Sequence, residues 1–232
     1  MGKDVIIACD FDSAQKTYEF LDKFTGRKPF VKIGMELFYA EGPSIVRGIK
    51  ERGHKIFLDL KLHDIPNTVK KAMKVLSKLD VDMTNLHASG TKRMMEAAIE
   101  GLTREDGTRP ILIAVTQLTS TDQESMTTDL LINEPIDKVV MHYASVACSA
   151  GLDGVVCSPL EAGKVHDTCG KNFVTVTPGV RFADGDIGDQ KRVMTPAQAK
   201  EIGSDYIVVG RPITAAEDPV AAYERCVSEF ID

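Results

Sequence analysis

The sequence predicts an α/β protein, a (β/α)8 barrel of the TIM type. Eight short runs rich in Val, Ile, Leu and Phe recur along the chain, and segments with helical spacing of apolar residues lie between them. Strands that alternate with helices favour a parallel sheet, and eight such units in 232 residues fit a closed barrel. A doubly wound open sheet is the rival fold, but no Gly-rich GxGxxG follows the first strand.

The elements follow one another without interruption. Helical segments carry apolar residues at i, i+3, i+4 and i+7, the one-sided spacing of a helix packed on a sheet. No linker, low-complexity tract or change of composition divides the chain, so we expect a single domain over residues 1–232. The predicted strands are residues 5–10, 30–34, 55–60, 81–87, 110–116, 153–157, 173–179 and 205–210, and the clearest helical patterns are residues 13–24, 42–53, 68–79, 91–102 and 218–230.

Charge and cysteine content narrow the class of protein. The net charge of −6 argues against nucleic acid as the main partner, because a phosphate backbone calls for a basic surface. The five cysteines are scattered without a CxxC spacing, which predicts neither a zinc site nor a disulfide framework. The N-terminal segment does not resemble a signal peptide, and no apolar run approaches the ~20 residues of a membrane span. We therefore expect a cytoplasmic protein with reduced thiols and no membrane partner.

The third predicted strand carries charges within an apolar run. In the segment FLDLKLHDIPNTV, Asp59 and Lys61 share one face, since side chains alternate along a strand. Burying two charges on one face is costly unless they pair or do chemistry. Lys32 at the end of the second strand and Asp64 extend the alternating set. A catalytic network, a structural salt-bridge network and a divalent metal site all fit, although the interleaved lysines argue against the metal because they already supply positive charge.

The eighth predicted strand ends in VVGRP, which predicts an anion site. Gly210 permits a ligand to approach the backbone closely, Arg211 supplies a fork of donors, and Pro212 suits the first turn of a helix. Barrels often hold a phosphate here, at a helix N-terminus after the eighth strand. Gln190 lies in the adjoining loop after the seventh strand. The other residues at predicted strand ends are Asp10, Asn85, His87, Thr116, Pro178, Gly179 and Arg181.

Two connections that follow strands are long, residues 117–135 and 181–192. We expect the first to have helical structure of its own, whereas the second is rich in Gly and Asp. Loops of this length in a compact domain are often lids, and surface loops without a role are the alternative. Together the residues predict a barrel enzyme for a small phosphorylated substrate, with no cofactor motif.

Four segments carry a resemblance to a known family. DLKLHDIPNT (59–68), TPGVR (177–181), GDQKRVMTP (188–196) and VVGRPI (208–213) resemble the orotidine 5′-monophosphate decarboxylases in their short bacterial form. The resemblance runs from Asp10 to the C-terminal helix in the same order and spacing. It implies an enzyme that converts orotidine 5′-monophosphate to UMP and CO2, the last step of de novo UMP synthesis, without a metal or an organic cofactor.

The resemblance also implies a role for each candidate residue. Lys61 would be the proton donor within a network of Lys32, Asp59 and Asp64. Loss of CO2 leaves a carbanion in the ring plane with no π system to absorb it, so the catalyst must hold charge already in position. Asp64 and Thr68 would reach into the partner's site in a homodimer. The implied substrate contacts are Asp10 and Lys32 at the ribose, Asp59 near the departing carboxylate, Thr119 near the pyrimidine, Arg181, Gln190, Gly210 and Arg211 at the phosphate, and Pro178 and Thr68.

One position departs from the family pattern, because Thr91 stands where the resemblance predicts a second glycine. Three other readings of the chain stay open. These are a metal-dependent sugar-phosphate decarboxylase or synthase of the same barrel family, a non-catalytic nucleotide-binding protein, and a structural barrel subunit. The last does not account for charged residues that collect at one end of the strands.

Overall fold

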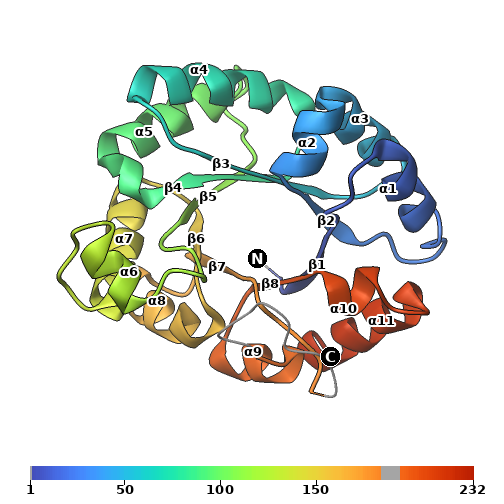
Figure 1. The fold of residues 1–232 in the computed structure, drawn as a ribbon. Coiled ribbons are helices and arrows are strands. Elements are labelled where there is room, and N and C mark those ends of the chain that lie inside the picture. The colour runs from blue at the N-terminus through green and yellow to red at the C-terminus, as the bar shows by residue number, and fades with distance from the viewer. Residues whose placement is uncertain (1, 184–193) are drawn as a thin grey trace.

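A computed structural model describes residues 2–183 and 194–232 of the chain. Within these residues the strands form a closed parallel barrel in which each strand pairs with its successor and β8 pairs with β1 (Figure 1). Each strand overlaps one of the predicted runs, so the predicted fold class is confirmed. The strands are β1 (Asp4–Ala8), β2 (Phe30–Ile33), β3 (Ile56–Leu62), β4 (Met83–His87), β5 (Ile111–Val115), β6 (Gly154–Val156), β7 (Val174–Thr177) and β8 (Tyr206–Val209).

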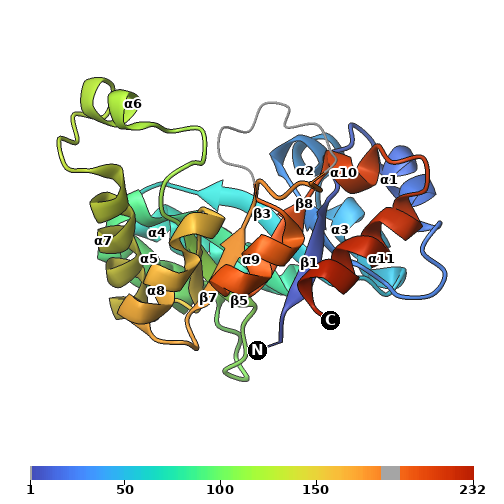
Figure 2. The same ribbon diagram turned by 90° about the horizontal axis from the view of Figure 1, so that it is seen from below.

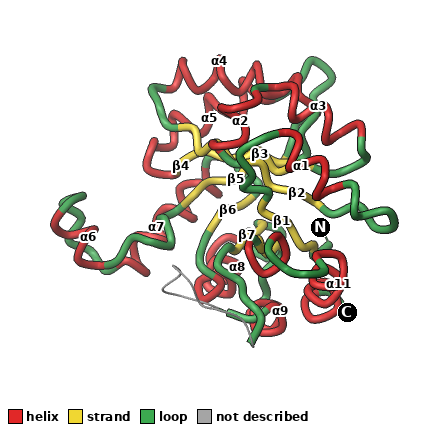
Figure 3. Tube along the Cα trace, turned by 45° about the vertical axis from the view of Figure 1, so that its right-hand side comes forward, coloured by secondary structure: helices red, strands yellow, loops and turns green. Residues whose placement is uncertain are grey.

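Helices surround the barrel (Figures 1 and 3). Several connections hold two helices instead of one, as where Gly42 at φ 64° and Pro43 separate α2 from α3. None of the helices in the described ranges combines the length and apolar character that a membrane span requires. The α-helices are α1 (Ala14–Leu21), α2 (Met35–Glu41), α3 (Pro43–Glu51), α4 (Pro66–Leu76), α5 (Thr91–Leu102), α6 (Gln123–Thr128), α7 (Ile136–Ser149), α8 (Ala162–Cys169), α9 (Pro196–Ile202), α10 (Arg211–Thr214) and α11 (Pro219–Phe230), with short 3-10 turns at Ser77–Leu79, Ala88–Gly90 and Pro159–Glu161.

The connection between β5 and β6 contains the helix that the sequence predicts for residues 117–135. Residues 117–135 contain the short helix α6, which stands away from the barrel in Figure 2. Asp122 caps this helix by accepting a hydrogen bond from the main-chain N–H of Ser125 at 2.9 Å. The expected helical structure in this connection is therefore present.

Side chains alternate across the barrel wall and divide the core into two layers. Ile6, Phe57 and Val208 belong to a cluster inside the barrel, whereas Leu58 and Val209 belong to the larger cluster between strands and helices. This is the period of two expected for a strand, with both faces of a parallel sheet buried. Polar side chains on the inner face must therefore lie above or below the apolar interior, at the two ends of the barrel.

Three aspartates hold the amino end of the barrel. Asp82, Asp153 and Asp205 stand directly before β4, β6 and β8, and each reaches back to the preceding strand. Charge-assisted hydrogen bonds of this kind are among the stronger ones in proteins. The carboxylates accept from the main-chain N–H of Ile56 at 2.8 Å, of Leu112 at 2.7 Å and of Thr175 at 2.8 Å, and they pair with Lys50, Arg109 and His166 respectively.

Candidate active site

A pocket of about 200 Å³ opens at the carboxyl end of the barrel. Lys32 on β2 and Asp59 and Lys61 on β3 form its charged wall, and Phe57 and Val208 belong to its apolar lining. The residues that line it from the connections after β5 and β7 are Gln117, Leu118, Thr119 and Pro178. Three of the charged side chains predicted at the strand ends, Lys32, Asp59 and Lys61, are thus brought together beside an apolar surface.

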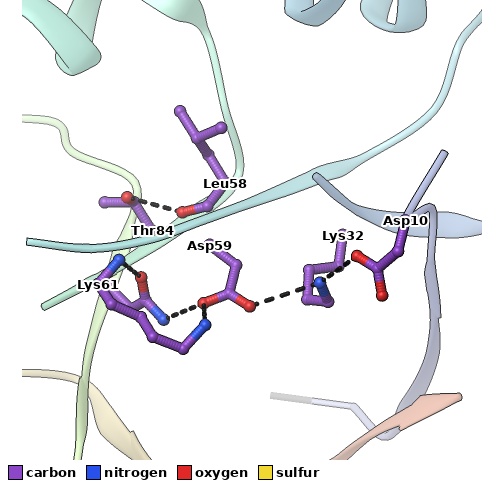
Figure 4. A network of polar contacts seen from close by, with 7 residues as sticks. Asp10, Lys32, Leu58, Asp59, Lys61 and Thr84 are labelled. Carbon is purple, nitrogen blue, oxygen red and sulfur yellow. Dashed lines mark hydrogen bonds and ion pairs between the residues drawn. The ribbon is translucent and has the colours of Figure 1, made fainter. Parts of the chain in front are cut away.

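Asp59 lies at the centre of a chain of alternating charges (Figure 4). Its Oδ1 accepts a hydrogen bond from Nζ of Lys61 at 2.7 Å, and its Oδ2 lies 3.5 Å from Nζ of Lys32. Lys32 Nζ in turn donates to Asp10 Oδ1 at 2.9 Å. The side chains of Asp59 and Lys32 are only 10% and 12% exposed, so these ion pairs are largely shielded from water.

The pairing keeps both buried groups charged. Burial alone would raise the pKa of Asp59, but the ammonium groups of Lys32 and Lys61 outweigh it and the pKa is lowered. Burial alone would lower the pKa of Lys32, but the carboxylates of Asp59 and Asp10 outweigh it and the pKa is raised. The pocket therefore presents fixed charges of both signs at neutral pH.

The backbone of β3 is irregular where it carries this chain of charges. Leu58 pairs with Thr84 of β4, but the next paired residues are Leu62 and Leu86, so three residues of β3 lie opposite one residue of β4. Lys61 has φ 51°, in the left-handed region that side chains other than glycine rarely adopt. The single residue opposite this bulge is Asn85, which the sequence placed at a strand end without assigning it a role.

Two histidines lie beside the site. The rings of His63, after β3, and His87, at the end of β4, have centroids 5.8 Å apart. Burial lowers the pKa of His87, and the nearby His63 and Lys61 lower it further. In the described ranges no three His, Cys, Asp or Glu side chains form a group that could hold a metal ion.

Three of the predicted phosphate residues follow the ends of β7 and β8 in the chain: Arg181, Gly210 and Arg211. Gly210 precedes α10, and Arg211 is the first residue of that helix and is exposed. A Cβ at Gly210 would come no closer than 3.6 Å to Ala8, so packing within the chain does not demand a glycine there. Arg181 is buried, and its guanidinium donates to the main-chain carbonyl of Val180 at 2.9 Å. Gln190 lies outside the described residues.

Asp64 and Thr68 are not among the residues that line the pocket in the described part of the chain. Both are exposed, Asp64 in the turn after β3 and Thr68 in the first turn of α4. Asp64 Oδ1 accepts from the main-chain N–H of Ile65 at 2.7 Å. In the part of the chain that the structure describes, the carboxylate paired with Lys61 is that of Asp59, and Asp64 makes no ion pair with it.

Comparison with known proteins assigns the family. The model of the orotidine 5′-phosphate decarboxylase / HUMPS family matches residues 3–226. The chain belongs to this family. Proteins named orotidine 5′-phosphate decarboxylase in Bacillus mycoides (strain KBAB4) and Bacillus cereus (strain B4264) are each 56% identical over 233 residues, which is 99% of this chain and 98% of theirs. The resemblance read from the sequence, and with it the expectation of an enzyme of this family, is confirmed.

Two solved structures share the fold of this chain. Orotidine 5′-phosphate decarboxylase from Lactobacillus acidophilus is 43% identical with a TM-score of 0.89, covering 99% of this chain and 100% of that one. An uncharacterized conserved protein from Geobacillus kaustophilus is 49% identical with a TM-score of 0.87, covering 97% and 99%. The agreement extends over the whole barrel.

Proposed function

We propose that this protein decarboxylates orotidine 5′-monophosphate to UMP and CO2 in pyrimidine biosynthesis, without a metal or an organic cofactor. The observation that carries the proposal is the ion-paired series Asp10, Lys32, Asp59 and Lys61 in a member of this family. Lys32, Asp59 and Lys61 of this series line the pocket. The 56% identical relatives are all named for this reaction, whereas the family description also covers HUMPS proteins. Residues 1–232 would then form one catalytic domain.

Lys61 is the proposed proton donor. Decarboxylation at C6 of the pyrimidine leaves an electron pair in the ring plane, which an ammonium group at that carbon stabilises and then protonates. The Asp59 carboxylate at 2.7 Å restrains the ammonium before the substrate arrives, so little reorganisation is needed during the reaction. The apolar lining, including Phe57 and Val208, lowers the local dielectric constant and strengthens these interactions.

The remaining candidate residues orient the substrate. We assign Asp10 and Lys32 to the ribose and Thr119 and Pro178, which line the pocket, to the side of the pyrimidine. Arg181, Gln190, Gly210 and Arg211 are assigned to the phosphate, and the space left open at Gly210 supports close approach of a ligand to the backbone. Because the phosphate is remote from the bond that breaks, its binding energy can stabilise the closed, reactive arrangement.

The test is loss of the ultraviolet absorbance of orotidine 5′-monophosphate with the purified protein. Turnover that persists after treatment with a chelator is expected. Absence of turnover in folded protein would refute the proposal, and turnover of keto-sugar phosphates that a chelator abolishes would favour the metal-dependent sugar-phosphate alternative.

We further propose a homodimer in which Asp64 and Thr68 complete the partner's site. Their exposure supports this assignment, and so does Ile65 beside them, which is 68% exposed although it is a large apolar residue. A two-fold axis would place two such turns against each other. The thiols of all five cysteines are free, which fits a cytoplasmic location.

Subunit exchange tests the shared site. Inactive Lys61→Ala and inactive Asp64→Ala chains are mixed, and heterodimer formation is followed with two affinity tags. One site of each heterodimer carries both lesions and the other carries neither, so activity should return to about half of wild type per heterodimer. Exchange without any return of activity would place Asp64 in the site of its own chain.

A further inference from the structure

Asn85 is a fully buried amide that lies between the two charged residues of β3. It is on β4, 0% exposed, opposite the bulge formed by residues 59–61. Its Oδ1 accepts a hydrogen bond from the main-chain N–H of Lys61 at 2.8 Å. Its Nδ2 donates to Oδ1 of Asp59 at 2.6 Å. One side chain thus holds the backbone of the lysine and the carboxylate of its partner.

The chemistry of the two contacts fixes the orientation of the amide. A flipped amide would direct its NH2 group at the N–H of Lys61 and its carbonyl oxygen at the Asp59 carboxylate, and both contacts would be repulsive. Among uncharged side chains of this size, only an amide offers an acceptor and a donor on one planar group. Serine and threonine have a single hydroxyl, and leucine has neither function.

The same contacts explain the irregular strand. At the bulge, β4 offers a single residue opposite three residues of β3, and the Asn85 side chain takes up the N–H of Lys61. Lys61 is at φ 51°, a conformation that costs roughly 1–2 kcal/mol for residues other than glycine. A strained residue persists only where its surroundings over-determine it, and Asn85 is one such surrounding contact.

Oδ1 of Asp59 accepts two hydrogen bonds, one from Nδ2 of Asn85 at 2.6 Å and one from Nζ of Lys61 at 2.7 Å. The amide therefore sets the rotation of the carboxylate to which the ammonium group is bound. We infer that Asn85 is a positioning residue of the reaction: it holds Lys61 and Asp59 in register, and it does so without touching the substrate. This inference rests on the proposed function, because it assigns Lys61 as the proton donor.

Asn85→Asp separates positioning from simple filling of space, because the two side chains have nearly the same shape. At neutral pH the introduced carboxylate still accepts from the N–H of Lys61 but faces the charge of Asp59. Misplacement of a reacting group by about 1 Å costs on the order of 100-fold in rate, and we expect a fall in kcat of that size. The Kd for UMP should change by no more than about threefold, since the assigned ribose and phosphate contacts are untouched.

The pH dependence of kcat in Asn85→Asp distinguishes positioning from a purely structural role, because loss of packing alone would not change with pH. Burial and the neighbouring Asp59 raise the pKa of the introduced carboxyl group. When it is protonated it regains an O–H donor for Asp59 and keeps a carbonyl acceptor for Lys61, as the amide has. The ratio of variant kcat to wild-type kcat should therefore rise as the pH falls.

Thr84→Val is the matched control. Thr84 is the preceding residue of β4, is also 0% exposed, and donates its hydroxyl to the main-chain carbonyl of Leu58 at 3.0 Å (Figure 4). The substitution removes one buried hydrogen bond outside the pocket, so Tm should fall while kcat stays near wild type. Asn85→Ser, whose shorter side chain cannot place a donor and an acceptor where Nδ2 and Oδ1 of the amide lie, provides a second measurement of kcat if Asn85→Asp does not fold.

Wild-type turnover is measured first, since its absence would refute the proposed function and not the geometry. With an active wild type, a large fall in kcat for the Asn85 variants, nearly unchanged UMP binding and a pH-dependent ratio support the inference. Soluble Asn85 variants with kcat near wild type, or with losses that only parallel the Tm and are independent of pH, would overturn it.

Discussion

The amino and carboxyl ends of the barrel both carry buried charges, but these charges have different surroundings. At the amino end, Asp82, Asp153 and Asp205 each accept a main-chain N–H and pair with a basic side chain. At the carboxyl end, the carboxylate of Asp59 holds two ammonium groups that also line an open pocket. Asp82 and Arg109 also line a hollow, of about 340 Å³, so neither charge nor a cavity alone marks a functional site. The carboxyl end differs in that the ammonium groups of Lys32 and Lys61 are held on one carboxylate beside an apolar surface.

Backbone strain differs between the ends as well. Four residues other than glycine have positive φ in the described ranges. Lys61 lies near the carboxyl end of β3, Thr91 follows β4, and Leu131 lies in the long connection after β5. Asp80 is at the amino end, and aspartate tolerates the left-handed region better than most residues do. Conformations that cost stability are thus concentrated where the candidate active site lies.

The sharpest test of this contrast is Lys61→Ala. Loss of a proton donor and of an electrostatic contact should lower kcat by about 10⁴-fold or more. UMP should still bind, because the assigned phosphate contacts remain. Steady-state kinetics measures the loss of kcat, and calorimetric titration with UMP measures the binding that should remain. Near-normal turnover would remove Lys61 from the mechanism.

Arg211→Ala should have the next largest effect. Hydrogen bonds to charged groups contribute roughly 1.5–3 kcal/mol, so kcat/KM for orotidine 5′-monophosphate should fall by about 10- to 150-fold. Decarboxylation of orotidine, which lacks the phosphate, should change little. Arg47→Ala, an exposed arginine on α3, is the control. Equal losses for both substrates would contradict the phosphate assignment.

At the opposite end, Asp153→Asn should affect stability and leave turnover intact. The Asp153 carboxylate accepts from the N–H of Leu112 and pairs with Arg109, and the side chain is only 24% exposed. Loss of the charge should cost about 2 kcal/mol in the free energy of unfolding. Urea unfolding measures this, with exposed Asp167→Asn on α8 as the control. A large fall in kcat per folded molecule would break the contrast between the two ends.

Much of the carboxyl end could be predicted from the sequence because a strand alternates with period two. That period placed Asp59 and Lys61 on one face, and the structure brings them to one pocket with Lys32. The role of Asn85 could not be predicted, since it depends on the bulge that sets residues 59–61 opposite it. Local spacing does not reveal how two strands lose register.

The amino end carried a signal that the sequence reading did not use. An aspartate precedes the apolar run of three alternate strands, at Asp82, Asp153 and Asp205, yet these residues were read only as parts of strands. Charged side chains therefore collect at both ends of the strands and not at one end alone. The site that Asp64 serves could not be predicted from periodicity either, because periodicity within one chain carries no information about contacts with a second chain.

The smallest predicted effect concerns Thr91, where the resemblance predicts a glycine. Thr91 has φ 74° and ψ 163°, a region occupied almost only by glycine. Relief of that strain should outweigh the extra entropy that glycine loses on folding, so Thr91→Gly should stabilise the protein by about 1 kcal/mol. For a chain of this size Tm should rise by about 2–4 °C.

The control for this substitution is Thr103→Gly at the other end of α5, where φ is −70° and no strain can be relieved. Thr103 also donates its hydroxyl to the carbonyl of Ile99 at 2.8 Å, so glycine should destabilise the protein there. Turnover should be unchanged in both variants, because neither residue lines the pocket. If Thr91→Gly lowers Tm as Thr103→Gly does, Thr91 is not strained. The concentration of strain at the carboxyl end would then rest on Lys61 and the loop residue Leu131.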